Sequence, residues 1–344
     1  MRVRYSGWCS EPTTNDRGRG RLRTRRTEGG AGTVEQRLDV TGADGVRLAA
    51  WEFSDPTSAG PARTGPARTG PAGAAPMSAG SGGPGRDSAV LLLHGLMGRA
   101  SHWAGTARWL AGRHRAVALD QRGHGRSDKP ADGRYTREAY VADAEATIEQ
   151  LGLAPVTLIG HSMGALTAWQ LAARRPELVR ALVISDMRAS ALGAASQREW
   201  RDWFRAWPVP FATLADVRKW FGEEDPWVER PTPARGEFFA EVMAERADGW
   251  APVFSRRQML SVRETWVHDA HWEELAHVRC PTLVVRGLDG ELGRAEAQEM
   301  VRVLPQGQYA EVSDAGHLVH YDRPDAWRAA IEPFLDGVVA AARS

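Results

Sequence analysis

The chain has 344 residues, of which 42% are hydrophobic and 25% are charged, a composition ordinary for a globular enzyme. Lys and Arg number 44 against 43 Asp and Glu, so a net charge of +1 gives no field that would draw the molecule to nucleic acid or to an anionic membrane. The sequence has no apolar run long enough for a transmembrane helix, and its start lacks the apolar segment of a secretory signal, so we expect a cytoplasmic protein without nucleic-acid or membrane partners.

Composition divides the chain into segments. Residues 1–32 are rich in Arg, Thr and Gly and are predicted to be a disordered basic tail. Residues 33–344 are predicted to form one α/β domain. Within it, Gly, Pro and Ala dominate residues 55–87, which we interpret as a low-complexity insertion without an assigned function.

The predicted elements follow the alternation of strands and helices that gives a mostly parallel central sheet covered by helices on both faces. Strands are predicted over 34–40, 46–53, 89–93, 115–119, 155–159, 179–185, 282–286 and 308–312, and helices over 101–112, 137–151, 163–174, 294–304 and 324–341. Residues 189–276 interrupt this alternation and are rich in tryptophan. We predict that they form a helical cap inserted after one strand of the sheet.

The strongest local signal is the sequence Gly160-His-Ser-Met-Gly164 between a predicted strand and a predicted helix. A G-x-S-x-G motif in that setting is a nucleophile elbow, a sharp turn that exposes the serine above the carboxyl edge of the sheet. Glycines suit the two outer positions because side chains there would collide with the adjoining strand and helix. Ser162 is therefore the candidate nucleophile.

Three motifs in this order resemble those of α/β-hydrolase fold enzymes, specifically the esterase, lactonase and haloperoxidase-like branch with a helical cap. They are His94-Gly-Leu-Met-Gly98, the glycine-rich segment Asp120–Asp128 and the elbow around Ser162. The resemblance covers about residues 33–336. It implies an oxyanion hole made by the backbone N–H groups of Leu96 and Met163.

The same resemblance implies a role for His94 in holding the loop of the first motif. We also name four residues as candidates for lining a substrate pocket: His94, His161, Trp203 and Trp207. The two tryptophans lie on one face of a predicted cap helix, a spacing that suits a pocket roof or the cap's own core.

A serine nucleophile needs a base, and the base needs a carboxylate to orient it. His317 lies between the last predicted strand and the last helix, where the resembling family places its catalytic histidine, and His320 is its nearest rival. For the acid we favour Asp289, which follows the strand 282–286. Asp186, which follows the strand 179–185, is the second choice, and Glu291 is the third.

Serine at position 162 implies an acyl-enzyme, and the preferred substrate is a small to medium apolar carboxylic ester or lactone. No metal or organic cofactor is implied, and the expected partner is a small-molecule substrate, with the oligomeric state left open. Two alternatives stand beside this interpretation: C–C bond hydrolysis or perhydrolysis with the same three residues, and a catalytically silent homologue that binds a ligand under the cap.

Overall fold

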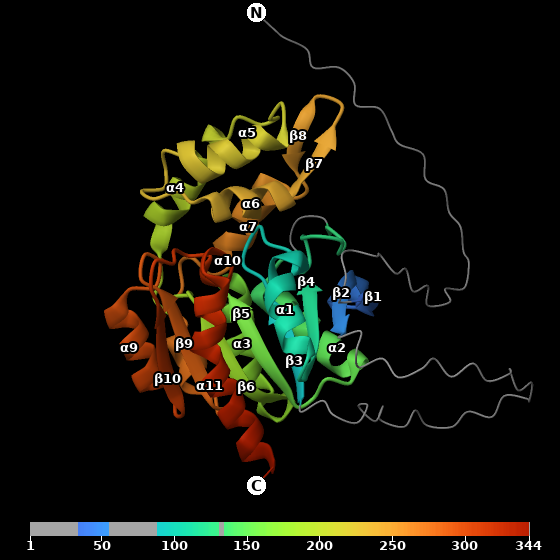
Figure 1. The fold of residues 1–344 in the computed structure, drawn as a ribbon, viewed down its shortest axis with the longest axis vertical. Coiled ribbons are helices and arrows are strands. Elements are labelled where there is room, and N and C mark those ends of the chain that lie inside the picture. The colour runs from blue at the N-terminus through green and yellow to red at the C-terminus, as the bar shows by residue number, and fades with distance from the viewer. Residues whose placement is uncertain (1–33, 55–87, 131–133, 344) are drawn as a thin grey trace, which may run out of the picture.

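An eight-stranded sheet forms the centre of the molecule in the computed structural model, which describes residues 34–54, 88–130 and 134–343 (Figure 1). From one edge to the other, its strands are β1 (Val34–Thr41), β2 (Arg47–Ser54), β4 (His114–Asp120), β3 (Ser88–Leu93), β5 (Val156–His161), β6 (Val179–Ser185), β9 (Thr282–Gly287) and β10 (Gly307–Val312). β2 pairs antiparallel with β1 and β4, and the pairs from β4 to β10 are parallel. The predicted mostly parallel sheet is confirmed.

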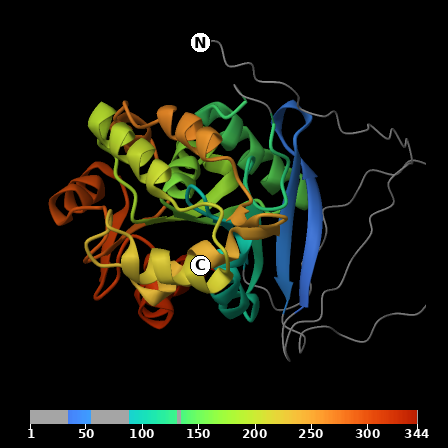
Figure 2. The same ribbon diagram turned by 90° about the horizontal axis from the view of Figure 1, so that it is seen from above.

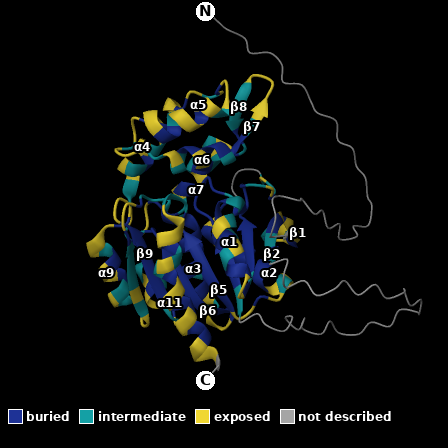
Figure 3. Ribbon diagram, viewed as in Figure 1, coloured by how far each residue is buried: buried dark blue, intermediate teal, exposed yellow. Residues whose placement is uncertain are grey.

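Helices cover both faces of the sheet, as Figure 2 shows from above. One face packs against α1 (Ala104–Ala111) and α11 (Pro324–Arg343), with Trp103 and Trp327 buried between them and the strands. The other face carries α2 (Arg137–Leu151), α3 (Met163–Arg174), α8 (Trp272–Ala276) and α9 (Arg294–Val303). The central strands are buried from both sides (Figure 3), which explains their near-continuous apolar sequences.

The predicted strands and helices match the observed ones to within a few residues at most ends. β5 extends two residues beyond its predicted end because Gly160 and His161 continue the ladder with β6. The helix predicted to begin at residue 101 starts as an α-helix only at Ala104, because the preceding turn, Ala100–Trp103, is a 3₁₀ helix. The predictions for residues 1–32 and 55–87 fall outside the described residues.

The segment after β6 forms a cap above the carboxyl edge of the sheet (Figure 1). It contains α4 (Gly193–Ala206), α5 (Leu214–Lys219), a π-helical turn (Trp220–Glu224), α6 (Pro233–Glu241) and α7 (Arg256–Glu264). The cap is not purely helical, because β7 (Met243–Arg246) and β8 (Gly249–Pro252) form an antiparallel hairpin. Its predicted end at residue 276 is also too late, since α8 packs against α3 on the sheet.

The chain enters and leaves the cap through a narrow neck. The backbone N–H groups of Leu192 and Gly193 on the outgoing segment both donate to the carbonyl oxygen of Val267 on the returning segment. Further down, the N–H of His271 donates to the carbonyl oxygen of Ala189. These bonds tie the two crossings side by side.

Within the described ranges, we find no helix whose length and apolar character together would let it cross a membrane.

Candidate active site

Ser162 occupies a strained turn between β5 and α3. Its backbone has φ of 51° and ψ of −124°, a conformation that a residue with a side chain adopts only when its surroundings enforce it. The flanking glycines are required by close approach: a Cβ at Gly160 would lie 2.5 Å from the backbone of Ala165, and one at Gly164 would lie 2.3 Å from the carbonyl oxygen of Leu93. The structure therefore has the geometry of a nucleophile elbow at the predicted serine.

His317 is bonded to a buried carboxylate, and that carboxylate belongs to Asp186. The distance between His317 Nδ1 and Asp186 Oδ2 is 2.7 Å, and the Asp186 side chain is fully buried. Asp186 follows β6 directly and has a positive φ of 44°, which turns its side chain toward β9 and the histidine loop. The same carboxylate accepts hydrogen bonds from the backbone N–H groups of Glu291, at 2.8 Å, and of Gly287, at 3.4 Å.

The prediction that Asp289 orients the histidine is wrong. Its side chain points to the surface, where it pairs with Arg230 at 3.2 Å, and it is 47% exposed. The backbone N–H of Asp289 donates to the carbonyl oxygen of Ala315, which directs the side chain away from His317. Glu291, the third choice, is exposed and contributes only its backbone N–H to Asp186. The second choice from the sequence is therefore the acid that the geometry selects.

Two backbone N–H groups remain unpaired beside the turn. Among the described residues, neither Leu96 nor Met163 donates its N–H to a protein acceptor, although both residues are buried. Unpaired buried N–H groups are rare and mark sites where another group is to be bound. Met163 directly follows Ser162 and begins α3, so its N–H lies at the positive end of the helix dipole.

Two buried histidines brace the loop that carries Leu96. His94 Nδ1 bonds to the carbonyl oxygen of Gly95 at 2.8 Å, and its Nε2 accepts the backbone N–H of Gln121 at 3.0 Å. His124 Nε2 accepts the N–H of Met97 at 3.2 Å. Both ring nitrogens of His94 are thus used, and the residue is 1% exposed, so its placement in a substrate pocket is wrong and its loop-holding role fits.

Trp203 and Trp207 lie in the cap's own aromatic core. The Trp203 indole N–H donates to Asp225 at 3.0 Å, and Arg235 lies over its ring. Trp207 packs edge-on against Phe221 with ring centroids 4.7 Å apart. Both side chains are buried in this aromatic cluster, and we assign them to the cap core instead of a pocket wall.

Burial keeps a set of five histidines near the site in the neutral form. Desolvation lowers the pKa of three of them to about 3 and that of the other two well below 6.5. We call this group the buried histidine set: His94, His102, His124, His161 and His320. A proton on any of them would be a charge in an apolar interior, so each is held neutral at physiological pH.

His317 has the opposite behaviour. Burial alone would lower its pKa, but the nearby charge of Glu291 and the hydrogen-bonded carboxylate of Asp186 outweigh it and raise the pKa to about 9. The environment therefore favours the imidazolium form of this histidine. His320, its rival in the sequence, is buried and stacks on Trp103 with ring centroids 3.8 Å apart. Neither of its ring nitrogens has a hydrogen-bond partner among the described residues.

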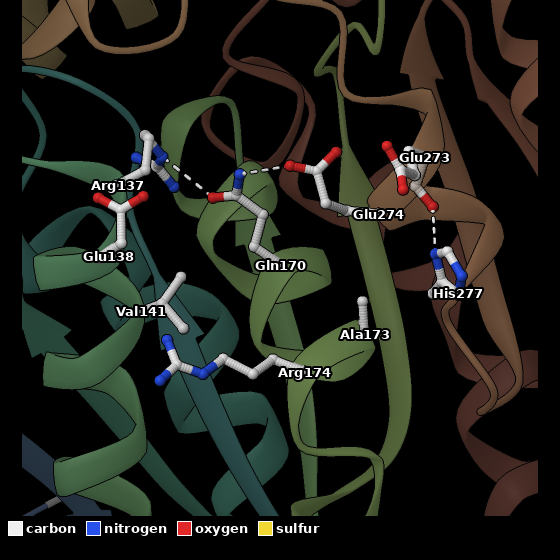
Figure 4. Close-up of a pocket in the computed structure, with 9 residues that line it drawn as sticks. All are labelled: Arg137, Glu138, Val141, Gln170, Ala173, Arg174, Glu273, Glu274 and His277. Atoms are coloured by element: carbon white, nitrogen blue, oxygen red, sulfur yellow. Dashed lines mark hydrogen bonds between the residues drawn. The ribbon is translucent and has the colours of Figure 1, made fainter.

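A separate surface cavity of about 310 Å³ lies between α2, α3 and α8 (Figure 4). It is lined by Arg137, Glu138, Val141, Gln170, Ala173, Arg174, Glu273, Glu274 and His277. Gln170 is two turns along α3 from Ser162, which places the cavity about 12 Å from the elbow. The cavity is therefore not part of the candidate site. Among the described residues, no group of three or more His, Cys, Asp and Glu side chains is arranged to bind a metal.

Comparison with known proteins identifies the family of the chain. A family model described as alpha/beta hydrolase fold matches residues 88–324, which is more than half of the chain. The chain belongs to the α/β-hydrolase family. The match spans the loop of Leu96, the turn of Ser162, Asp186, the cap and the loop of His317. Every part of the candidate site of this α/β hydrolase therefore lies within the matched region.

Relatives of this α/β hydrolase act on different bonds. An sn-1-specific diacylglycerol lipase of Mus musculus is 28% identical over 72% of this chain and 80% of its own. An N-formylmaleamate deformylase of Pseudomonas putida is 28% identical over 73% of this chain and 90% of its own. The crystal structure of an E-2-(acetamidomethylene)succinate hydrolase superimposes with a TM-score of 0.69 at 23% identity, covering 88% of this chain and 99% of that one. The chain is thus a hydrolase enzyme.

Sequence reasoning missed two residues that shape the site. His124 lies in the Asp120–Asp128 segment and had no assigned role, yet its Nε2 accepts the N–H of Met97 beside Leu96, the candidate oxyanion donor. Asp322 accepts the N–H of Gly316, next to His317, at 3.0 Å and the hydroxyl of Thr232 from the cap at 3.3 Å. No local pattern marks the His124–Met97 or the Thr232–Asp322 contact, because each joins segments far apart in the sequence.

Proposed function

We propose that this α/β hydrolase is a serine hydrolase that cleaves small to medium apolar carboxylic esters or lactones through an acyl-enzyme. The observation that carries the proposal is the hydrogen bond between His317 and the buried carboxylate of Asp186, at the same sheet edge where the strained turn presents Ser162. His161, the neighbour of Ser162, bonds the carbonyl oxygen of His317 at 2.8 Å, so the serine and histidine segments are in direct contact.

In the proposed mechanism, the hydroxyl oxygen of Ser162 attacks the carbonyl carbon while its proton passes to His317 Nε2. Asp186 accepts the Nδ1–H of His317, which fixes the ring orientation and stabilises the imidazolium that forms. The N–H groups of Leu96 and Met163 hold the negative charge on the carbonyl oxygen, a contribution of several kcal/mol in a water-excluded site. His317 then protonates the leaving alcohol, and a water molecule activated by the same imidazole releases the acid.

The Ser162 hydroxyl makes no hydrogen bond to another described residue in the resting arrangement. Hydrogen bonds of this kind are commonly long in unliganded sites and tighten when substrate binds. The raised pKa of His317 gives the proposal a pH signature: the base is neutral, and therefore active, only as the pH rises toward about 9.

The proposal is tested with purified protein, p-nitrophenyl butyrate and an organofluorophosphonate probe. We expect ester hydrolysis and covalent labelling of Ser162, located by peptide mapping, and we expect Ser162→Ala to abolish both. Ser261→Ala is the matched control, because Ser261 is an exposed cap residue whose hydroxyl bonds only the carbonyl oxygen of Arg257. A Ser162→Ala protein that keeps either signal would refute the proposal.

A second candidate reaction, hydrolysis of an N-acyl or N-formyl amide, is favoured by the similarity to the deformylase of Pseudomonas putida. It uses the same three side chains, because amide hydrolysis also passes through an acyl-enzyme and a tetrahedral oxyanion. A substrate panel containing a butyrate ester and a formyl amide distinguishes the two by kcat/KM. Labelling of Ser162 without turnover of any substrate in the panel would favour a ligand-binding homologue instead.

A further inference from the structure

His161 joins the turn of Ser162 to the loop of His317. It is the last residue of β5, it is 2% exposed, and its Nε2 lies 2.8 Å from the backbone carbonyl oxygen of His317. The two imidazole rings lie with centroids 4.7 Å apart. Because a carbonyl oxygen only accepts hydrogen bonds, the proton of the neutral His161 ring is on Nε2.

The other side of the His161 ring contacts the oxyanion loop. A Cβ at Gly95 would lie 2.7 Å from His161 Nδ1 and 3.1 Å from the Cβ of Ser162, so a glycine is required where this ring passes. Leu96, the candidate oxyanion donor, directly follows that glycine. One buried ring therefore contacts the turn of Ser162, the loop that carries Leu96 and the loop that carries His317. We call the last of these, residues 313–318, the base loop.

The base loop is also attached elsewhere, since the carbonyl oxygen of Ala315 accepts the backbone N–H of Asp289. The backbone N–H of Gly316 donates to Asp322, and the His317 ring donates to Asp186. The bond to Asp186 links the His317 ring to the serine turn only through β6, whose Ser185 accepts the N–H of Ser162 at 3.0 Å, and it leaves a gap between the His317 backbone and β5. The bond from His161 to the carbonyl oxygen of His317 is the described contact that spans this gap directly.

We propose that His161 is a positioning residue, whose Nε2–H holds the backbone of His317 at a fixed distance from the nucleophile turn. The proposal rests on the proposed serine hydrolase function. It explains why an imidazole occupies a position that faces neither solvent nor, in the proposed mechanism, the reacting atoms. It also explains why the ring must stay neutral, since a neutral ring offers one N–H to His317 and leaves Nδ1 unprotonated against Gly95.

Two substitutions at His161 test the proposal. His161→Met keeps a similar volume and removes the donor, whereas His161→Gln places an amide N–H at the reach of Nε2. We expect His161→Met to lower kcat about 10- to 100-fold with KM within about 3-fold, because a displaced base loses alignment more than affinity. We expect His161→Gln to recover most of the loss. The rate at which the fluorophosphonate labels Ser162 should change in parallel.

His277→Met is the matched control. His277 is exposed, and its Nδ1 also donates to a backbone carbonyl oxygen, that of Glu273, at 2.8 Å, but it lies on the separate cavity of Figure 4. This variant should keep kcat and the labelling rate within about 2-fold of the parent. The comparison separates the loss of a positioned base from the loss of one histidine-to-carbonyl bond elsewhere.

A spectroscopic measurement distinguishes failure of this proposal from failure of the proposed function. The Nδ1–H of His317, bonded to Asp186, should give a low-field proton resonance that broadens in His161→Met and returns in His161→Gln. A parent protein that is neither labelled nor active would refute the hydrolase function while leaving this resonance to test positioning.

The positioning role is overturned if folded His161→Met keeps kcat within about 3-fold of the parent. It is equally overturned if His161→Gln is as impaired as His161→Met. Should His161→Met fail to fold, His161→Gln is compared with His161→Asn, whose shorter amide does not reach the Nε2 position. Equal activity of those two folded variants would then refute the proposal.

Discussion

Replacement of Asp186 by Asn tests the assignment of the acid most directly. The substitution keeps the shape of the side chain and removes its charge from a fully buried position 2.7 Å from His317 Nδ1. The carboxylates around His317 raise its pKa from 6.5 to about 9, which corresponds to about 3 kcal/mol in favour of the imidazolium. That stabilisation acts on the charge that develops on His317 in the transition state.

Asp186 contributes a large part of the stabilisation of the His317 imidazolium, because it is buried and hydrogen-bonded to the ring. Glu291 is exposed, so solvent screens its charge. A loss of about 2–3 kcal/mol lowers kcat/KM about 30- to 200-fold. The loss of ring orientation adds up to about 100-fold more. Above about pH 9, where His317 of the parent is neutral, we therefore expect Asp186→Asn to reduce kcat/KM by about 10²- to 10⁴-fold, with little change in KM.

The assay is hydrolysis of p-nitrophenyl butyrate by Asp186→Asn and by the matched control Asp289→Asn, with Tm measured for both proteins. Asp289 makes an ion pair with Arg230 between side chains that are 47% and 72% exposed, so its loss costs about 0–1 kcal/mol of stability and leaves kcat/KM within about 3-fold. The reasoning is refuted if folded Asp186→Asn retains a tenth of the parent activity, or if Asp289→Asn is the more impaired variant.

Three further predictions concern the same site. Gly290→Ala should lower kcat/KM at least about 10-fold, because its Cβ would lie 2.5 Å from Asp186 Oδ1. Gly293→Ala is the control and should keep the parent activity, because the space around its Cβ is open. Equal activities of the two variants would contradict this prediction. Glu291→Gln should lower the pKa of His317 and move the rising limb of the kcat/KM profile to lower pH by about 0.5, and an unmoved or raised limb would argue against a charge effect. The buried histidine set should make the fold acid-labile, because the pKa of each ring is lower in the folded protein than the 6.5 of the unfolded chain. The folded state is therefore favoured fully above pH 6.5 and loses stability as the pH falls below that value. Keeping one such ring neutral costs about 2 kcal/mol of folding stability at about pH 5. We therefore expect circular dichroism to show cooperative unfolding near that pH. A fold that survives to about pH 4 would show that these rings are not held neutral.

His317 contributes to the pH dependence of stability with the opposite sign. Its folded pKa of about 9 lies above the unfolded value of 6.5, so its stabilisation is complete below pH 6.5 and is lost as the pH rises from there to about 9. The protein should therefore lose stability for different reasons at the two ends of the range. On the acid side, the fold fails. On the alkaline side, the base becomes active while one stabilising ion pair disappears.

The sheet could be predicted from the sequence because its strands are apolar runs of strand length separated by amphipathic helices. The elbow could be located because Gly160 and Gly164 flank a serine between a strand and a helix, and the structure shows the close contacts that exclude side chains there. The β7–β8 hairpin was missed because each strand has only four residues, too few for a clear alternation. The sequence also left undecided whether Trp203 and Trp207 line a pocket or pack in the cap core, because an apolar helix face suits both.

The identity of the acid could not be read from the sequence for a physical reason. Asp186 and Asp289 both follow strands that end at the same edge of the sheet, so spacing alone leaves them equivalent. What separates them is a backbone turn: the positive φ at Asp186 directs its side chain inward, and the bond from the Asp289 N–H to Ala315 directs the other side chain outward. The structure also shows why residue 290 is a glycine: a Cβ there would lie 2.5 Å from Asp186 Oδ1.

The narrow neck below the cap has a practical consequence. The outgoing and returning segments meet at Ala189 and His271, three residues beyond Asp186 and well before β9. A foreign lid can therefore be transplanted between these two positions while the acid, the base and the elbow keep their own sequence. Such chimeras would show how far substrate choice is portable between members of the family.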